Sequence, residues 1–547
     1  MMSATCADRW SPPGTPIRGF APRWLTVCLG LALGLVGLGL AAVPLAAGER
    51  QILIKVAQYP RSLDFLCLDG ADWALGGRTG KIAPGARGQI TGVLTARALL
   101  RHHVVVADVP LAETGKLDAL TQPWQAAGWP VHRLTLGQTF TGPDGMPLAD
   151  NRRALAAIAV FDEPAPAQAL VASLTAAGET ATVYDEVVHL AQGLITLKVN
   201  GETLATGQEL SLRLQGLIRL YRVEYAVGYP WHGFADRDYR GRLLVRWGAH
   251  DALDCILQQD LDRVLAGIVP SEISAKAETG ALQAQAVAAR GEIMASIGIR
   301  HAAEGFDTCS EQHCQVYNGE TVHVASIAPK IEPTRGLVLV KPNGAVLNAV
   351  YSSNCGGHTE ANHLVWTTTP EPILAGRWDA PAAPALDLSE EEQVGVFIRQ
   401  PPAGCFCNDP TVEGGDKFRW TKTITGSDWK AIEDKLGLGR IKQVTDLARG
   451  FSGRIYQMTF IGEKGRTTVN KELTIRQLLG SLRSSCFIAE WQRDAAGFIT
   501  GVELHGAGFG HGVGMCQTGA QALAKRGWTF DRILAHYYPG SLLKAWY

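Results

Sequence analysis

Glu272 is the acidic residue whose surroundings best suit proton transfer. It follows Ser271 at the joint between two segments with helical apolar spacing, residues 260–268 and 281–297, and Val269-Pro270 is expected to end the first. A carboxyl group between two apolar helices is partly desolvated, which raises its pKa and lets it hold a proton near neutral pH. From the residue alone, a plain helix-entry charge near the positive end of the second helix is the simpler interpretation.

A glycine run near the end of the chain, within His505–Gly527, is the second notable pattern. Every second residue from Gly506 to Gly514 is glycine. In a strand this would leave one face bare, so that another backbone or a sugar ring could approach closely. A cysteine nucleophile at Cys516 with His511 lacks an orienting third group. A dinucleotide loop is excluded, because the spacing alternates and the flanking order is not βαβ.

A third group of residues could bind metal. Two imidazoles and two thiols could close a tetrahedral zinc site: His301, Cys309, His313 and Cys314. A Cys309–Cys314 disulfide, which export would favour, and free buried thiols are the alternatives. Weaker metal candidates are Cys355, His358 and His363. Cys405-x-Cys407 is too tightly spaced for an ordinary zinc knuckle, and we assign it no chemistry.

The N-terminal segment 1–49 is typical of an export signal or an uncleaved membrane anchor. Arg18 and Arg23 precede an uncharged apolar run from Trp24 to Ala47; a buried core helix is the third option. We therefore expect a periplasmic, cell-envelope or extracellular protein that meets the membrane only through this segment. Two of the eleven cysteines lie in it, and the odd number left means that at least one is free or metal-bound.

Composition narrows the class of protein. The 547 residues suggest two or three domains. Lys+Arg (51) and Asp+Glu (52) nearly cancel, which argues against a nucleic-acid binder that depends on a large basic field.

The expected fold class is α+β. Short apolar runs and turn signals predict a β-rich accessory domain over residues 50–236, with a strand at 104–106, an Asn200-Gly201 hairpin, and possible helices at 154–160 and 165–177. Residues 237–547 predict a mixed α+β domain with short helices packed on β-sheets and a variable insertion near 368–415. Its smaller elements are a hairpin through Pro342-Asn-Gly344, strands at 455–460, 467–469 and 498–504, and helices at 520–525 and from about 529 to before Pro539.

Four motifs, in order over Arg240–Gly540, resemble the stage II sporulation protein D / amidase enhancer LytB (SpoIID/LytB) family. They are Ile268-Val-Pro-Ser-Glu-Ile273 with Ala281–Arg290, Cys314-Gln-Val-Tyr-Asn-Gly319, Tyr351–Glu360, and Gly508–Gln517 with Tyr537-Tyr-Pro-Gly540. The chain departs from the family pattern at Glu278, Gly280 and Cys516.

The resemblance implies action on peptidoglycan. Sporulation members are similar to lytic transglycosylases, which cut MurNAc–GlcNAc bonds in peptide-stripped glycan strands; no cofactor is required, and some members hold a structural zinc. Glu272 then maps onto the catalytic glutamate, and one carboxyl group of raised pKa is enough for it to act as acid and then as base. Arg290 would bind substrate or form a structural ion pair, while Tyr317, His511 and Gln517 would line or support the groove.

LytB-type members imply a different function, a non-catalytic wall-binding protein that enhances a cell-wall amidase. An envelope scaffold with a degenerate site is a third possibility, although the glutamate position is intact.

Overall fold

The computed structural model describes residues 50–228, 231–312, 314–321, 323–366 and 369–547, so the expected export segment 1–49 lies outside the described residues. Within the described ranges, no helix combines the length and apolar character needed to cross a membrane. The class is α+β with a β-rich N-terminal region, as expected. The described residues form two units, one of 101–135 with 154–186, the other of 50–100, 136–153 and 187–547.

The smaller unit is a four-stranded sheet in the order β11-β6-β10-β7 with two helices. Its elements are β6 (Leu99–Pro110), α1 (Thr114–Ala126), β7 (His132–Leu136), β10 (Arg153–Phe161), α2 (Pro164–Ala176) and β11 (Thr182–His189). The strand at 104–106 and the helix at 165–177 are confirmed. The helix expected at 154–160 is wrong: β10 lies between two other strands and buries successive residues, which removes the alternation that marks a strand.

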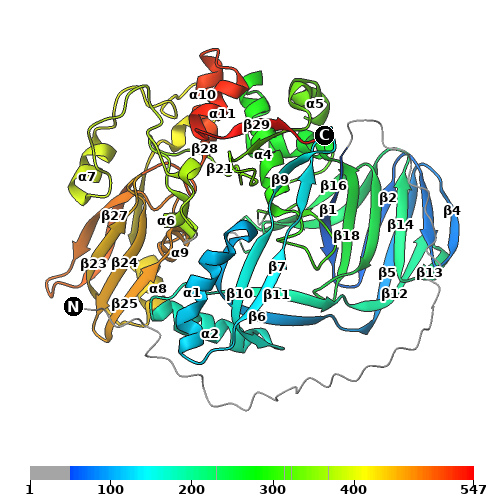
Figure 1. The fold of residues 1–547 in the computed structure, drawn as a ribbon, viewed down its shortest axis with the longest axis horizontal. Coiled ribbons are helices and arrows are strands. Elements are labelled where there is room, and N and C mark those ends of the chain that lie inside the picture. The colour runs from blue at the N-terminus through cyan, green and yellow to red at the C-terminus, as the bar shows by residue number, and fades with distance from the viewer. Residues whose placement is uncertain (1–49, 229–230, 313, 322, 367–368) are drawn as a thin grey trace. The chain divides into compact units, whose positions relative to one another are not determined.

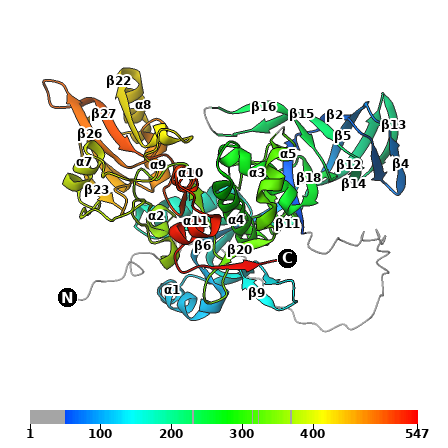
Figure 2. The same cartoon turned by 90° about the horizontal axis from the view of Figure 1, so that it is seen from above.

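Two sheets of the larger unit contact each other and share one core (Figure 2). The seven-stranded sheet contains β19 (Thr308–Cys309), β1 (Gln51–Tyr59), β18 (Leu253–Asp260), β17 (Arg242–Trp247), β14 (Glu209–Leu214), β3 (Ala71–Leu75) and β4 (Arg78–Ile82). The six-stranded sheet contains β13 (Glu202–Gly207), β12 (Gln192–Val199), β5 (Ala86–Ala96), β2 (Ser62–Cys67), β15 (Ile218–Tyr225) and β16 (Gly233–Tyr239). The β12–β13 hairpin turns through Asn200 and Gly201, both with positive φ, as expected.

The boundary expected between 236 and 237 falls within β16 (Gly233–Tyr239). The seven-stranded sheet combines strands from both sides of it, for example β1 with β18. The division into accessory and catalytic domains stays a prediction.

Helix α4 (Thr279–Ser296) is the centre of a helical layer in the larger unit (Figure 1). It contacts four other helices: α3 (Leu261–Glu272), α5 (Val324–Ile331), α10 (Gln517–Lys525) and α11 (Phe530–Tyr537). The Asp260 side chain caps α3 by accepting a hydrogen bond from the Arg263 amide. The stop expected at Pro270 is wrong, because α3 continues to Glu272; its last turn closes with the Ile273 amide bonded to the Val269 carbonyl.

A second core in the larger unit lies between two three-stranded sheets and short helices. These elements are β22 (Arg419–Thr425), α8 (Gly426–Leu436), β23 (Ile441–Arg449), β24 (Ile455–Gly462), β25 (Gly465–Asn470), α9 (Glu472–Leu478), β26 (Phe487–Arg493) and β27 (Ile499–Ala507). The expected strands at 455–460, 467–469 and 498–504 are confirmed in β24, β25 and β27. The expected insertion near 368–415 contains α7 (Glu391–Arg399), and α6 (Asn362–Trp366) precedes it.

Short pairings complete the larger unit. They are β8 (Thr139–Thr141) with β9 (Pro147–Asp150), β20 (Leu337–Val340) with β29 (Leu542–Ala545), and β21 (Tyr351–Ser352) with β28 (Met515–Cys516). The turn at Asn343 and Gly344 forms, with the Lys341 amide bonded to the Ala345 carbonyl. The expected hairpin is only partly correct. β20 pairs with β29, and the residues after the turn pair with it only through one isolated bridge between Val340 and Val346.

The glycine run is not the extended strand that the alternation predicted. β27 ends at Ala507, and Gly508, Gly510, Gly512 and Gly514 all have positive φ, from 72° to 97°. A Cβ atom at Gly514 would lie 2.0 Å from the Val350 carbonyl oxygen. The glycines therefore allow close approach of the protein's own chain, in a backbone conformation that residues with a Cβ rarely adopt.

Gly514→Ala should destabilise the protein strongly, because it adds a left-handed backbone penalty to a clash with the Val350 backbone. We expect the free energy of unfolding, measured by denaturant titration, to fall by about 3 kcal/mol or more. Gly527→Ala is the matched control: its φ is also positive, but a Cβ atom there meets nothing within 4 Å. That variant should lose only about 1–2 kcal/mol, and equal losses would contradict the close-approach argument.

Candidate functional site

Glu272 ends α3 in a half-buried position. Its Oε1 accepts a hydrogen bond from the Val316 amide at 3.1 Å, and the Gln517 side chain also hydrogen-bonds to the carboxyl group. Burial raises the pKa of Glu272 to about 7, although these two hydrogen bonds act in the opposite direction by favouring the carboxylate. The group can therefore give up and regain a proton near neutral pH.

Gln517 links the end of the glycine run to Glu272. It is the first residue of α10, and its Nε2 lies 3.3 Å from Oε1 of Gln285 on α4. Gln285 also hydrogen-bonds to the Tyr351 side chain. The structure thus brings together two residues expected at the site, Glu272 and Gln517, from segments about 245 residues apart in the printed sequence.

Glu292 is a second carboxyl group at this site, and the sequence analysis missed it. It projects from α4, and burial raises its pKa to about 8, with a further increase from the charge of Glu272 and an opposing effect of Arg300. Gln285 and Glu292 are seven residues apart, so they lie on one face of α4. The sequence did contain a signal for Glu292: together with Gln285 it places two polar residues on one face of an otherwise alanine-rich helix.

His511 lies at the edge of this group, beside Tyr351. Its Nδ1 accepts a hydrogen bond from the Val513 amide at 3.0 Å, and its ring centroid lies 5.0 Å from that of Trp366. Burial, followed by the charges of Arg454 and Arg476, lowers the pKa of His511 to about 3. The imidazole is therefore neutral near pH 7. It supplies no positive charge, and its hydrogen bond to the Val513 amide stabilises the backbone of the glycine run.

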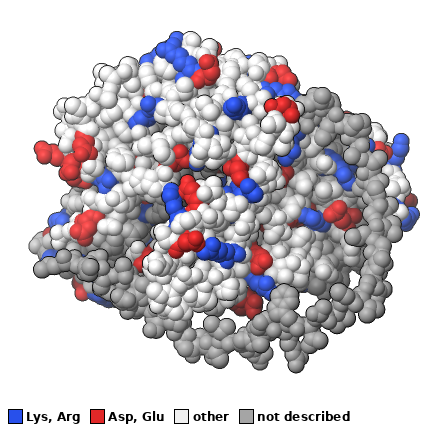
Figure 3. Space-filling view, in the orientation of Figure 1, with Lys and Arg blue, Asp and Glu red and all other residues white. Residues whose placement is uncertain are grey.

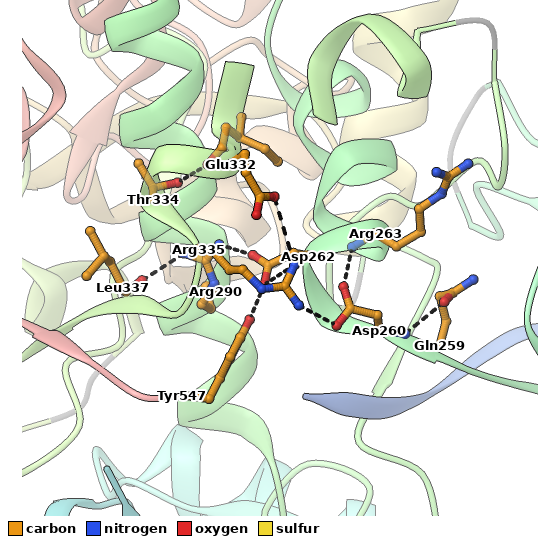
Figure 4. Close-up of polar contacts among 11 residues, drawn as sticks. Gln259, Asp260, Asp262, Arg263, Arg290, Glu332, Thr334, Arg335, Leu337 and Tyr547 are labelled. Carbon is orange, nitrogen blue, oxygen red and sulfur yellow. Dashed lines mark hydrogen bonds and ion pairs between the residues drawn. The ribbon is translucent and has the colours of Figure 1, made fainter. Parts of the chain in front are cut away.

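Arg290 is in the protein interior, where it forms an ion pair (Figure 4). Its guanidinium pairs with Asp262 and donates to the Leu337 carbonyl at 2.7 Å. Asp262 in turn accepts a hydrogen bond from the Tyr547 hydroxyl at 2.6 Å. These contacts support the structural ion-pair alternative for Arg290 and give no support to substrate binding.

Tyr317 is also in the interior. It is 1% exposed, and its ring lies 6.2 Å from that of Tyr239. Gly267 of α3 packs against it so closely that a Cβ atom there would lie 2.6 Å from the ring. The substrate-binding role expected for Tyr317 gains no support from this position, and a packing role explains it.

Three of the four residues expected to bind zinc lie together: His301, Cys309 and Cys314. Their ligand atoms are within 4.8 Å of one another, and His301 Nε2 is 3.3 Å from Cys314 Sγ. The other ring nitrogen of His301 contacts Glu304 at 2.7 Å, the carboxylate–imidazole arrangement that orients metal-binding histidines. The fourth, His313, lies outside the described residues.

Of the weaker metal candidates, neither His358 nor His363 belongs to a group of three or more possible metal ligands among the described residues. His358 Nδ1 contacts the Thr359 carbonyl at 2.6 Å, and burial lowers the pKa of His358 to about 4. Cys355 instead meets Cys407, to which the sequence analysis assigned no chemistry.

Charges of both signs are interspersed on the face of the molecule drawn in Figure 3. That face shows no extended field of one sign. Recognition of a ligand there would depend on local groups rather than on a long-range potential.

Comparison with known proteins gives two family matches. Residues 249–340 match the family described as "Stage II sporulation protein", a range that includes α3, α4 and the cluster of His301, Cys309 and Cys314. Residues 360–514 match a domain described as of unknown function.

Relatives match about half of the chain or more. The "Amidase enhancer" of Bacillus subtilis is 26% identical over 297 residues, which cover 52% of this chain and 40% of that protein. "Stage II sporulation protein D" of the same organism is 27% identical over 300 residues, or 51% of this chain and 73% of that protein. An uncharacterized protein of Brachyspira hyodysenteriae is 25% identical over 365 residues, 65% of this chain and 82% of that protein.

Glu292→Gln should change the pH dependence of stability. Because the folded-state pKa of Glu292 is raised to about 8, its contribution to stability is full below the ordinary pKa of 4.5 and is lost as pH rises through about 8. Glutamine lacks this loss. Relative to wild type, the variant's free energy of unfolding should therefore rise by about 1–3 kcal/mol between about pH 5 and pH 9.

Denaturant titrations at the two pH values measure this difference. Glu202→Gln, at an exposed position in β13, is the control and should show no such change. A pH-independent difference for Glu292→Gln would mean that this carboxyl group is not desolvated.

Proposed function

Because residues 249–340 match the family described as "Stage II sporulation protein", we propose that the chain is an exported cell-wall enzyme, a lytic transglycosylase. Its substrate is the MurNAc–GlcNAc bond of peptide-stripped peptidoglycan strands. The observation that carries the proposal is Glu272: a half-buried carboxyl group with a pKa of about 7, at the end of a helix within the matched domain.

The reaction needs one group that can act first as an acid and then as a base. Protonated Glu272 gives its proton to the glycosidic oxygen as the bond to the MurNAc C1 breaks. The resulting carboxylate then takes the proton of the sugar's own 6-hydroxyl, whose oxygen attacks C1 and closes a 1,6-anhydro ring. The proton returns to Glu272, and no water is consumed.

Neighbouring groups adjust Glu272 to both halves of this cycle. Burial favours the acid form, while the Val316 amide and the Gln517 side chain stabilise the carboxylate that forms after proton transfer. Glu292, which is largely protonated near neutral pH at a pKa of about 8, adds little repulsion to that carboxylate.

The His301, Cys309 and Cys314 cluster fits a structural zinc ion. The donor set is two thiols and an imidazole whose second nitrogen is held by Glu304. A bound ion would fix the loop that runs from Cys314 to Val316, whose amide donates to Glu272. The chain's own residues carry out every step of the proton transfer.

The remaining assignments belong to the same proposal. Residues 1–49 would direct export or anchor the chain to the membrane, so that the protein meets glycan strands outside the cytoplasm. Residues 50–236 would be an accessory domain.

The alternative is a wall-binding protein that enhances a cell-wall amidase. The B. subtilis relative carries the name "Amidase enhancer", and 40% of its length aligns with this chain. In that function the partner enzyme would cleave, and Glu272 would be dispensable.

Glu272→Gln should abolish glycan cleavage, since the amide can neither donate a proton to the leaving oxygen nor take one from the 6-hydroxyl. We expect product formation to fall by about 10²–10⁴-fold. The measurement is mass spectrometry of 1,6-anhydro products from purified peptide-free glycan strands.

Glu278→Gln, at an exposed position six residues further on, is the matched control and should keep activity. No product from wild type, or equal product from Glu272→Gln, would exclude the catalytic proposal. Wall degradation that needs an added amidase and survives Glu272→Gln would establish the enhancer function instead.

Metal removal should impair cleavage through the Cys314–Val316 loop. Treatment of wild type with a strong chelator should lower product formation by about 10-fold or more, and zinc should restore it. Cys309→Ser should have the same effect and should not respond to zinc. Full activity in protein shown by mass spectrometry to be metal-free would contradict this role.

A further inference from the structure

Four buried side chains from distant segments of the larger unit meet at one point: Cys355, Asp379, Cys407 and Cys516. Their ligand atoms all lie within 4.8 Å of one another, and each residue is at most 2% exposed. Cys355 Sγ is 3.5 Å from Cys407 Sγ and donates to Asp379 Oδ2 at 3.3 Å. The cluster shares no residue with the group around Glu272 or with the cluster of His301, Cys309 and Cys314.

The spacing suits a tetrahedral metal site. With zinc–sulfur bonds of about 2.3 Å, two thiolate ligands of a tetrahedral ion are about 3.8 Å apart. The Cys355–Cys407 separation of 3.5 Å is close to this value, whereas a disulfide needs about 2.05 Å. Three thiolates with one carboxylate are a donor set that zinc accepts.

Surrounding groups hold the ligand atoms in place. Asp379 Oδ1 is bound by the Tyr537 hydroxyl at 2.8 Å and by His536 Nε2 at 3.3 Å, which leaves Oδ2 for the sulfur atoms. Cys516 Sγ accepts hydrogen bonds from the amides of Cys355 at 3.2 Å and Gly519 at 3.4 Å. Such contacts outside the ligands orient metal sites and favour the anionic form of the sulfur.

Backbone pairing fixes the segments that carry the ligands. The Asp379 amide donates to the Gly357 carbonyl at 2.9 Å, and the Phe406 amide donates to the Asp379 carbonyl at 2.8 Å. Cys516 of β28 pairs with Ser352 of β21, three residues before Cys355. These hydrogen bonds bring together the segments that carry the four ligands.

Positive charge lies beside the cluster. Binding would release the three thiol protons, and three thiolates, one carboxylate and a divalent cation carry a net charge of −2. Two arginines donate hydrogen bonds to backbone carbonyls next to the cluster. Arg454 donates to the Cys355 carbonyl at 3.3 Å, and Arg419 donates to the Gly356 carbonyl at 2.8 Å. Their guanidinium groups would offset this charge.

We propose that this cluster binds one zinc ion as a closed structural site, with four protein ligands: Cys355, Asp379, Cys407 and Cys516. The site joins the insertion, which carries Asp379 and Cys407, to the start of α10. Since Gln517 directly follows Cys516 and contacts Glu272, the ion would also fix this neighbour of the carboxyl group.

Differential alkylation of the full wild-type chain tests the proposal without any variant. Protein purified with zinc and a reductant that does not bind metal is alkylated before and after chelation, and each cysteine is then quantified by mass spectrometry. Chelation should increase labelling of Cys355, Cys407 and Cys516 together, while that of buried Cys405 and Cys486 stays unchanged. Unchanged labelling of all three after chelation would overturn the proposal.

Metal content of variants provides the second measurement. Cys407→Ser and Cys516→Ser should each carry about one zinc ion less per chain than wild type, whereas Cys405→Ser, two residues from a ligand, should not. Cys309→Ser reports on the other cluster and should leave protection of Cys355 intact. A Cys355–Cys407 disulfide in protein isolated from an oxidising compartment, with no loss of zinc in Cys407→Ser, would refute the metal site.

Discussion

Desolvation of one carboxyl group is the constraint on which the rest of the site depends. Glu272 ends α3 where that helix meets α4 and α10, so its charged form loses solvation by water. The Val316 amide and the Gln517 side chain return part of that stabilisation. With burial alone the carboxyl group would stay protonated near neutral pH, and with the hydrogen bonds alone it would stay ionised. Together they place its pKa near 7, so that it can both donate and accept a proton.

The partners of Glu272 come from segments that other parts of the fold must hold. Val316 follows a loop that begins at the cluster of His301, Cys309 and Cys314. Gln517 follows the glycine run, whose left-handed turns let Val350 and Arg454 approach the backbone closely. Neither segment has a long helix or strand to stiffen it. Tight backbone contact fixes the second segment, and the proposed metal ion would fix the first.

Buried ionisable groups in this chain occur in two settings, one an ion pair and the other a pair of carboxyl groups with raised pKa values. Arg290 and Asp262 neutralise each other inside the helical layer, with Tyr547 bonded to the same carboxylate. For Glu272 and Glu292, burial is the largest influence and raises both pKa values, and Arg300 offsets only part of the rise at Glu292. This contrast separates a structural ion pair from two carboxyl groups on adjacent helices whose pKa values lie near neutral pH.

The sequence by itself determined several local elements and the candidate acid, Glu272. Apolar spacing located α3 and α4, the Asn200-Gly201 pair located a hairpin, and the Pro-Ser-Glu motif located Glu272, because each signal is contained in a few consecutive residues. Only the tertiary structure decided that Glu292 joins Glu272, that the glycines are left-handed turns, that Arg290 is an ion pair, and that Cys407 meets Cys355 and Cys516. Those facts depend on contacts between residues far apart in the chain, and local spacing carries no information about which distant segment will supply the neighbour.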